Sequence, residues 1–302
     1  MPRLSIRNGD DVKKVLLTGS SGFVGRNLLE ALCGKYSIDA PRRSELDLND
    51  QYQVDSFLKG KKYECIILAS NPSPLRSGDS TETMMLSMLT QYFSIVRRRE
   101  SYDKLIYFGS GAEYDKSYDI CQAREEEIGL KIPQSQYGLA KYIMNQHARN
   151  SDSIYNLRLF GCFGPYEYWP TCFISNAICR VLFQMPISIR QNVFFDYIYI
   201  DDVAKVVEWL IENNPSEKDY NLCSGHKIDL CSIANMVLEV SGAKSEIRVK
   251  REGLNLEYTG NCERLSGAFA GFSITPIKEG ISKLYEWYES HMDTIDPNKI
   301  LD

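Results

Sequence analysis

A tyrosine and a lysine stand four residues apart in the segment "YGLAK", as Tyr137 and Lys141. On a helix this spacing puts both side chains on one face. A lysine beside a phenol stabilises the phenolate, so the pair could exchange a proton with a carbonyl oxygen. About one such spacing is expected by chance in a chain with 19 tyrosines. The pair therefore needs support from the segments around it.

Ser110 provides part of that support. It ends the apolar run "KLIYFGS" (104–110), which reads as a buried strand. A serine hydroxyl beside Tyr137 would hydrogen-bond the same carbonyl oxygen and hold it for attack. The alternative is a serine that only forms a turn at the end of its strand.

Strand-like and helix-like segments alternate around these residues. Strands are expected at 14–19, 36–40, 64–70, 104–110 and 154–161, and helices at 25–35, 53–62, 81–99 and 137–150. This alternation predicts an α/β fold with a doubly wound parallel Rossmann sheet. Because ligands lie at the carboxyl ends of such strands, segments 18–25, 69–72, 109–114 and 159–164 should line one crevice.

The pattern changes after position 161, where aromatic, proline and cysteine residues interrupt it. We expect a Rossmann domain over 1–160, with a return around 198–212, and a smaller mixed α/β substrate domain over 161–302. Residues 1–12 read as a short polar leader.

Composition narrows the class of protein. The hydrophobic content of 43%, the charged content of 25% and the net charge of -5 predict an ordinary globule without general attraction to nucleic acid or membrane. Nine cysteines without a CxxC pair favour a reduced, cytoplasmic chain, and three scattered histidines lower the expectation of a metal site.

The segment "TGSSGFVG" joins the first strand to the first helix through Gly19, Gly22 and Gly25. The glycines allow a tight turn, close approach of a pyrophosphate and helix packing, while the helix N-terminus offers free N–H groups. A purely structural turn is the alternative. The predicted cradle comprises Gly19, Ser20, Ser21, Gly22, Phe23, Val24 and Gly25.

The end of the second strand selects the cofactor. Arg42 and Arg43 stand where a 2′-phosphate would lie and favour NADP(H) over NAD(H). Asp39, 20 residues after Gly19, is the rival group and would favour NAD. Asp47 and Leu48 follow as an expected adenine contact, with a helix-capping aspartate as the alternative reading of Asp47.

Together, "TGSSGFVG", "IILAS", "LIYFGSGAEY", "YGLAK", "LRLFGCFGP", "FDYIYIDDVA" and "YNLCSG" resemble the extended short-chain dehydrogenase/reductases that act on nucleotide sugars as epimerases, dehydratases and reductases. The resemblance covers nearly the whole chain. It implies that Ser110, Tyr137 and Lys141 are catalytic and that Lys141 also holds the nicotinamide ribose. Further cofactor contacts are expected at Ala69, Ser70, Asn71, Ser87 and Phe160.

The segment "RRSELDLND" looks most like the GDP-fucose synthase and deoxysugar 4-ketoreductase branch, which uses NADPH. GDP-fucose synthase also epimerises, with a cysteine and a histidine whose positions match Ala112 and Cys172 here. Without this cysteine–histidine pair the chain lacks the usual acid and base for epimerisation, which favours plain reduction. Cys172 is either a lone acid or base or a structural cysteine. Expected substrate contacts are Ser110, Gly111, Ala112, Gly161, Cys172, Arg180 and Arg190.

Several of these positions depart from the family pattern. Gly161 and Phe195 replace a usual asparagine and a usual arginine, and Arg190 is a possible substitute for the second. Arg180 is either a diphosphate contact or a solvated helix charge. The aromatic cluster "GPYEYWP" (164–170) either stacks on the base or lines the domain junction.

We therefore expect an NADPH-dependent reductase of a nucleotide-diphosphate 4-keto sugar. A nucleotide-sugar epimerase, either a 4-epimerase or a bifunctional epimerase/reductase, is the first alternative, and a non-catalytic NADP sensor is the second. A dehydratase is disfavoured because only Glu113 follows Ser110 where that branch has an acidic pair. The resemblance also implies a homodimer formed through helices 81–99 and 137–150.

Overall fold

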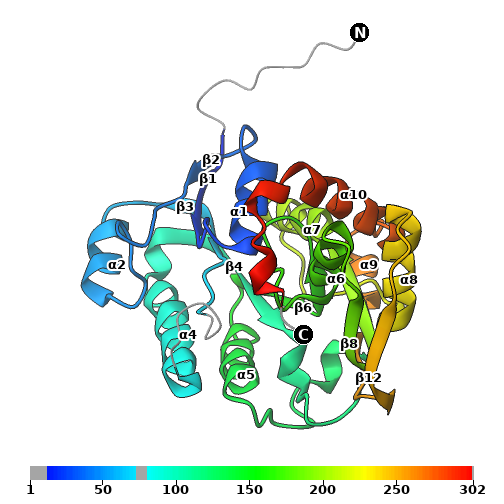
Figure 1. Cartoon of the computed structure of the whole chain (residues 1–302). Coiled ribbons are helices and arrows are strands. Elements are labelled where there is room, and N and C mark those ends of the chain that lie inside the picture. The colour runs from blue at the N-terminus through cyan, green and yellow to red at the C-terminus, as the bar shows by residue number, and fades with distance from the viewer. Residues whose placement is uncertain (1–11, 73–79, 301–302) are drawn as a thin grey trace.

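The computed structural model describes residues 12–72 and 80–300. A six-stranded parallel sheet forms its centre, in the order β10-β6-β4-β3-β1-β2 (Figure 1). The strands are β1 (Lys14–Thr18), β2 (Ser37–Asp39), β3 (Tyr63–Leu68), β4 (Tyr102–Ser110), β6 (Ile154–Leu159) and β10 (Asp219–Leu222). The predicted doubly wound α/β sheet is confirmed.

Helices cover both faces of this sheet because alternate side chains of each strand point to opposite faces. Leu17 packs toward α1 and α7, whereas its neighbour Leu16 packs toward α2, α4 and α5. The helices are α1 (Phe23–Leu32), α2 (Gln51–Leu58), α4 (Thr81–Val96), α5 (Gln136–Ala148) and α7 (Ile200–Glu212).

Two smaller sheets and four further helices are formed mainly by the second half of the described chain, and one of their strands, β5, comes from the first half. One sheet has the order β11-β9-β13-β5 with β7 beside β9, and the other pairs β8 with β12. The strands are β5 (Ile120–Ala123), β7 (Gly161–Phe163), β8 (Ile187–Asn192), β9 (Phe194–Tyr199), β11 (Lys227–Asp229), β12 (Ile247–Leu254) and β13 (Tyr258–Gly260). The helices are α6 (Phe173–Leu182), α8 (Leu230–Ser241), α9 (Glu263–Ala268) and α10 (Ile277–Ser290).

Five short 3₁₀ turns complete the described elements: η1 (Arg99–Ser101), η2 (Gly111–Tyr114), η3 (Glu125–Glu127), η4 (Met292–Thr294) and η5 (Pro297–Lys299). Of these, η2 directly follows the end of β4. It therefore lies at the edge of the sheet where ligands of such folds are held.

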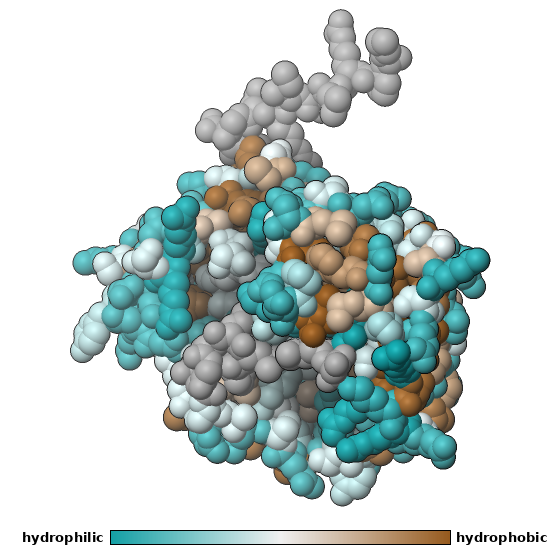
Figure 2. Space-filling view, in the orientation of Figure 1, coloured by the Kyte–Doolittle hydropathy of each residue, from teal (hydrophilic) through white to brown (hydrophobic). Residues whose placement is uncertain are grey.

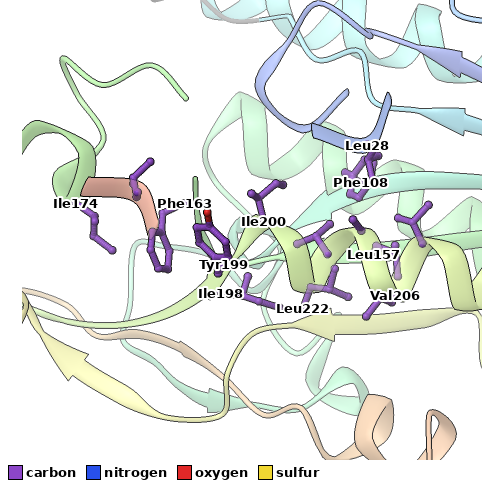
Figure 3. Packing of buried hydrophobic residues seen from close by; sticks show 14 of the residues in the cluster. Leu28, Phe108, Leu157, Phe163, Ile174, Ile198, Tyr199, Ile200, Val206 and Leu222 are labelled. Carbon is purple, nitrogen blue, oxygen red and sulfur yellow. The ribbon is translucent and has the colours of Figure 1, made fainter. Parts of the chain in front are cut away.

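One apolar core joins the two halves. Figure 3 shows Leu28 of α1, Phe108 of β4 and Val206 of α7 in the same cluster as Phe163 and Ile174. Fully burying one such side chain stabilises the fold by about 1.5–3 kcal/mol. The second half is therefore fixed to the sheet by continuous packing.

Most predicted elements of the Rossmann half lie within a few residues of their predicted positions. Two details differ. Helix α1 ends at Leu32, two residues before Gly34, and the return segment 198–212 is mostly helix α7, whereas the sixth strand, β10, lies beyond it at Asp219–Leu222. The four-residue β10 was missed because its segment is short and mixes polar with apolar residues.

The visible surface is mainly hydrophilic, with an apolar patch over the region of α6 and α10 (Figure 2). Across the described ranges, no helix combines the length and apolar character needed to cross a bilayer. The cysteines at all nine positions are free thiols.

Candidate active site

Ser110 and Tyr137 meet at the carboxyl end of β4. Ser110 caps the η2 turn, and its Oγ accepts the Ala112 N–H at 3.2 Å. Helix α5 packs on this turn through Gly138, where a Cβ would lie 2.6 Å from the Ala112 carbonyl oxygen. This close packing places Tyr137, in the first turn of α5, near the Ser110 hydroxyl.

Lys141 lies one helical turn further along α5. Its side chain is buried, and Nζ donates to the Phe108 carbonyl oxygen at 2.6 Å and lies 5.9 Å from the centre of the Tyr137 ring. Burial lowers the pKa of Lys141 to about 8, against the opposing charge of Glu113. The ammonium group therefore keeps its proton near neutral pH but holds it weakly.

Tyr137 is a protonated phenol at neutral pH. Burial raises its pKa above the ordinary value of 10, and the charge of Glu113 adds to this, while the hydrogen bond with Ser110 acts in the opposite direction. The sequence predicts that Lys141 lowers the Tyr137 pKa. In the protein itself this effect is outweighed by burial, because the Lys141 ammonium donates to the Phe108 carbonyl oxygen. The phenol is thus set to donate a proton.

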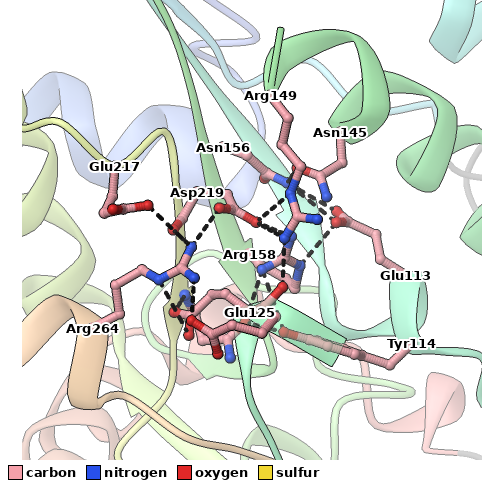
Figure 4. A network of polar contacts seen from close by, with 12 residues as sticks. Glu113, Tyr114, Glu125, Asn145, Arg149, Asn156, Arg158, Glu217, Asp219 and Arg264 are labelled. Atoms are coloured by element: carbon pink, nitrogen blue, oxygen red, sulfur yellow. Dashed lines mark hydrogen bonds and ion pairs between the residues drawn. The ribbon is translucent and has the colours of Figure 1, made fainter. Parts of the chain in front are cut away.

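A buried ion network lies beneath Ser110 (Figure 4). Arg158 has no exposed surface; its Nε contacts Glu113 at 2.8 Å and its Nη2 contacts Asp219 at 2.9 Å. Arg149 and Arg264 bind Asp219 from the other side. The network ties the end of β4 to β6, β10 and α9.

Glu113 connects this network to the backbone of Ser110. Its Oε1 accepts the Ser110 backbone N–H at 3.0 Å, and its side chain is fully buried. A Cβ at position 109 would lie 2.3 Å from the same oxygen, so Gly109 makes room for the carboxylate. The sequence pattern indicated Glu113 only as one half of the acidic pair of dehydratases. It did not reveal the ion pair, because the partner Arg158 lies 45 residues further along the chain.

The glycine turn has the geometry of a phosphate cradle. Gly19 has φ +73°, and a Cβ there would lie 2.5 Å from the Ser70 backbone nitrogen. A Cβ on Gly25 would lie 2.1 Å from the Gly19 carbonyl oxygen, so strand, turn and helix approach too closely for side chains. Gly22 caps α1 without a side-chain acceptor among the described residues, leaving the first N–H groups for an anion.

Ser70 also fits a bound cofactor. Its hydroxyl is buried and has no hydrogen-bond partner within the described part of the chain. Together with Asn71 and Lys141 it lines a small cavity. A buried hydroxyl without a partner beside a phosphate cradle is a site that a polar ligand would complete.

The cofactor-selecting residues follow β2. Arg42 and Arg43 are exposed just beyond the strand, and Arg43 Nε contacts Asp47 at 3.2 Å. Asp39, the last residue of β2, accepts a hydrogen bond from the Tyr63 hydroxyl at 2.6 Å. Asp39 and both arginines are exposed; Asp39 is hydrogen-bonded to Tyr63 and Arg43 is paired with Asp47.

The remaining predicted cofactor contacts are placed as follows. Asp50, not Asp47, caps α2, so the helix-capping interpretation of Asp47 is wrong. Leu48 is buried in the α2–α4 core. Ala69 follows β3, and Ser87 of α4 donates to Asn49 at 2.8 Å.

Phe160 lies at the domain junction. Its ring packs between Tyr114 and Tyr258, with ring centres 6.1 and 5.1 Å apart. Phe160 also lies next to the turn after Ser110, since a Cβ on Gly111 would be 2.8 Å from its ring. Its contact with a cofactor stays a prediction.

The predicted substrate residues divide into two groups. Gly111 and Ala112 lie in η2 beside Ser110. Gly161 permits β7 to approach β9, since a Cβ there would lie 2.7 Å from the Asp196 carbonyl oxygen. Its replacement of the family asparagine therefore has a packing reason.

Arg180 and Arg190 lie further out in the second half. Arg180 is 2% exposed and donates to Asn176 and to the Pro186 carbonyl, so the interpretation as a solvated charge is wrong. Arg190 is exposed on β8, beside the β12 segment that carries Arg248, Lys250 and Arg251.

Cys172 lies beside a buried carboxylate that the sequence did not reveal. It caps α6 and, with Ser175, hydrogen-bonds Glu167. Burial raises the pKa of Glu167 to about 7, and these hydrogen bonds only partly oppose the shift. In the same segment, Tyr166 lies between Arg26 and Trp287, so this aromatic residue lines the domain junction.

Tyr258 is a second residue that the sequence search missed. Its hydroxyl lies 3.5 Å from Ser110 Oγ, and the side chain is buried. It comes from β13, about 150 residues after Ser110, and a period-2 pattern over three residues is too short to predict its direction.

A family model described as the NAD dependent epimerase/dehydratase family matches residues 15–223. The chain belongs to this family. ADP-L-glycero-D-manno-heptose-6-epimerase of Cupriavidus pinatubonensis is 23% identical, with 90% of this chain and 98% of the relative covered. GDP-L-fucose synthase of Sinorhizobium fredii is 22% identical, with 93% and 97% covered.

A solved structure with the same fold is the GDP-mannoheptose C4 reductase of Campylobacter jejuni with NADP bound. Its TM-score is 0.77 at 19% sequence identity, and the alignment covers 92% of this chain and 98% of that one. The family and fold expectations of the sequence are thus confirmed.

Replacing Gly25 by alanine should disrupt the cradle, because the new Cβ must displace the Gly19 carbonyl. We expect NADP and NAD binding to weaken more than tenfold by calorimetry. Gly267→Ala is the control, since its Cβ would meet no atom within 4 Å. Unchanged affinity in Gly25→Ala would contradict the assignment of this turn.

Replacing Arg158 by methionine should leave the buried Glu113 without its counter-charge, whereas Asp219 keeps Arg149 and Arg264. We expect the free energy of unfolding in urea to fall by about 3–5 kcal/mol. Lys278→Ala removes an exposed ion pair with Glu239 and should change it by less than about 1 kcal/mol. Equal effects would show that the network does not stabilise the fold.

Glu167 should make stability depend on pH. Its folded pKa of about 7 lies above the ordinary 4.5, so the stability from its neutral form is complete below the ordinary value and is lost as pH rises through 7. The free energy of unfolding of Glu167→Gln, relative to that of the wild type, should therefore rise by about 3 kcal/mol as the pH is raised from acidic to mildly basic. The measurement is urea unfolding across pH, with the exposed Glu246→Gln as control; a flat difference for Glu167→Gln would rule this out.

Proposed function

We propose that this protein is an NADPH-dependent reductase of a nucleotide-diphosphate 4-keto sugar. The observation that carries the proposal is that the Ser110 hydroxyl and the protonated Tyr137 phenol come together at the carboxyl end of β4. Two hydroxyl groups at one point can together bind and protonate a single carbonyl oxygen. Reduction of a ketone needs a proton at that oxygen.

The cofactor half of the site supports a nicotinamide dinucleotide. Gly19, Gly22 and Gly25 would hold the pyrophosphate on the α1 N-terminus, and Ser70 offers its unpaired hydroxyl. Exposed Arg42 and Arg43 support NADP over NAD, since Asp39 already accepts a bond from Tyr63. Bound NADPH would supply the hydride.

The chain's own residues then have distinct roles. Ser110 would orient the sugar carbonyl, and Tyr137 would give its proton to the oxygen as charge develops there. Lys141, buried between α5 and β4, would hold ribose hydroxyls and add positive charge near the phenol. Each role uses a group that is already ordered by protein contacts.

The second half offers basic groups for a diphosphate. Arg190, Arg248 and Arg251 are exposed on the β8–β12 pair, and a nucleotide diphosphate would find several cationic partners there. We infer reduction without epimerisation, because Ala112 carries no acid or base. The relatives include a reductase and a fucose synthase, which agrees with this substrate class.

A nucleotide-sugar epimerase is the second candidate. Cys172 hydrogen-bonds Glu167, whose pKa of about 7 suits a general acid or base. One relative is itself an epimerase. Incubation with the keto sugar in deuterated water distinguishes the two, because epimerisation exchanges the proton beside the ketone and plain reduction does not.

We also propose a homodimer in which helices α4 and α5 pair across the interface. These helices contact each other along the sheet, and α4 exposes Leu86 and Phe93. Sedimentation at several concentrations tests this. A non-catalytic NADP sensor is disfavoured, because a sensor has no need for a serine and tyrosine bonded at the strand end.

Replacing Tyr137 by phenylalanine should reduce turnover at least a hundredfold, because the proton donor is lost while the ring remains. Affinity for NADPH should change less than threefold. The assays are NADPH consumption with GDP-, UDP-, dTDP- and CDP-linked 4-keto sugars and a thermal-shift comparison of NADP with NAD. Retained turnover would reject the proton-donor role, and stabilisation by NAD alone would reject the cofactor assignment.

A further inference from the structure

The second half of the protein contributes a phenol to the catalytic strand end. Tyr258 of β13 lies with its hydroxyl 3.5 Å from Ser110 Oγ. This approach depends on Gly111, where a Cβ would lie 2.6 Å from the Tyr258 hydroxyl oxygen. A side chain at position 111 would therefore push the phenol away from the site.

Strand pairing and ring packing fix the direction of Tyr258. It is paired with Phe195 of β9 and Ile120 of β5, and its ring contacts Phe160 and Phe195 with centres 5.1 and 5.5 Å apart. Its neighbour Thr259 accepts from the Gln122 N–H and so faces away from Ser110. The position is built by the fold and is not a chance rotamer at the surface.

The hydrogen bonds at Ser110 can be counted. Ser110 has one proton to donate and two lone pairs. One lone pair accepts the Ala112 N–H at 3.2 Å, and the hydroxyl also faces the two phenols Tyr137 and Tyr258. If Ser110 donated to Tyr258, no proton would remain for Tyr137 or for a carbonyl.

Tyr258 keeps the hydrogen that such a bond needs. Burial raises the pKa of Tyr258, and the charges of Tyr137, Glu113 and Tyr114 add to this, while the Ser110 hydrogen bond acts against it. The Lys116 ammonium lies 4.4 Å from the centre of the ring. At neutral pH Tyr258 is a neutral phenol, so its hydroxyl hydrogen is available to Ser110 and the group is a poor base for epimerisation.

We propose that Tyr258 is a positioning residue that donates its hydroxyl hydrogen to Ser110. The single Ser110 proton is then left for Tyr137 in the free protein and for the carbonyl oxygen once a keto sugar is bound. This inference deepens the proposed reductase function and rests on it for its kinetic test. It makes the site dependent on both halves of the chain, because Ser110 is ordered from η2 by Glu113 and from β13 by Tyr258.

The test compares Tyr258→Phe with Tyr155→Phe. Both remove a buried hydroxyl and keep the ring, but Tyr155 lies near the start of β6 and its hydroxyl donates to the Pro215 carbonyl oxygen at 3.2 Å. For Tyr258→Phe we expect kcat about tenfold lower, the loss of roughly one hydrogen bond. KM for the nucleotide sugar and the thermal midpoint should stay near those of Tyr155→Phe, which should keep the wild-type kcat.

A second measurement needs no turnover. Tyrosinate absorbance is titrated in the NADP complex, and the Tyr137 signal is identified as the part lost in Tyr137→Phe. A weaker donor at Ser110 stabilises the Tyr137 phenolate less, so Tyr258→Phe should raise the Tyr137 pKa by about half a unit to one unit. Tyr155→Phe should leave this pKa unchanged.

The outcomes separate the two proposals. A wild-type protein without turnover on any keto sugar rejects the reductase function, and the titration then decides the role of Tyr258 alone. A raised KM at unchanged kcat in Tyr258→Phe would make Tyr258 a substrate contact and overturn the positioning role. An unchanged kcat together with an unchanged Tyr137 pKa would also overturn it.

Discussion

The buried ion pair between Glu113 and Arg158 is the constraint on which the rest of the site depends. Neither side chain has exposed surface, and the pair lies directly beneath Ser110, whose backbone N–H it holds. Two charges without water are stable only when each is paired and hydrogen-bonded. The pair therefore requires β4 and β6 to keep their register, and this register sets the position of Ser110.

Close backbone approach is the second condition for this site. Three glycines around Ser110 each leave space that another element uses: Gly109 admits the Glu113 carboxylate, Gly111 admits Tyr258, and Gly138 admits the Ala112 carbonyl. The same principle forms the cradle at Gly19 and Gly25. Cofactor and substrate sides of the crevice are thus both built by contacts that any side chain would block.

The two sides of the crevice differ in how strongly they define the chemistry. The cradle, Tyr137 and Lys141 fit the family and support nicotinamide chemistry in general. On the substrate side, Ala112 of η2 carries no acid or base, and Cys172 lies beside the buried Glu167. The two curated relatives described above, an epimerase and a fucose synthase, share about equal identity with the chain, so the distinguishing evidence is in these side chains.

The sequence by itself determined the parallel sheet, the glycine cradle and the Ser110, Tyr137 and Lys141 set, because each depends on local periodicity or fixed short spacing. Only the tertiary structure decided the rest. Strand β10, the Glu113–Arg158 pair and the contact of Tyr258 with Ser110 join residues about 45 to 150 positions apart, and no local pattern encodes such pairs. The surroundings of charged groups were also decided by the tertiary structure. Arg180 and Glu167 are both buried, which their residue types alone do not predict. Burial shifts the pKa of Glu167, and its extent depends on what the whole chain packs around the group.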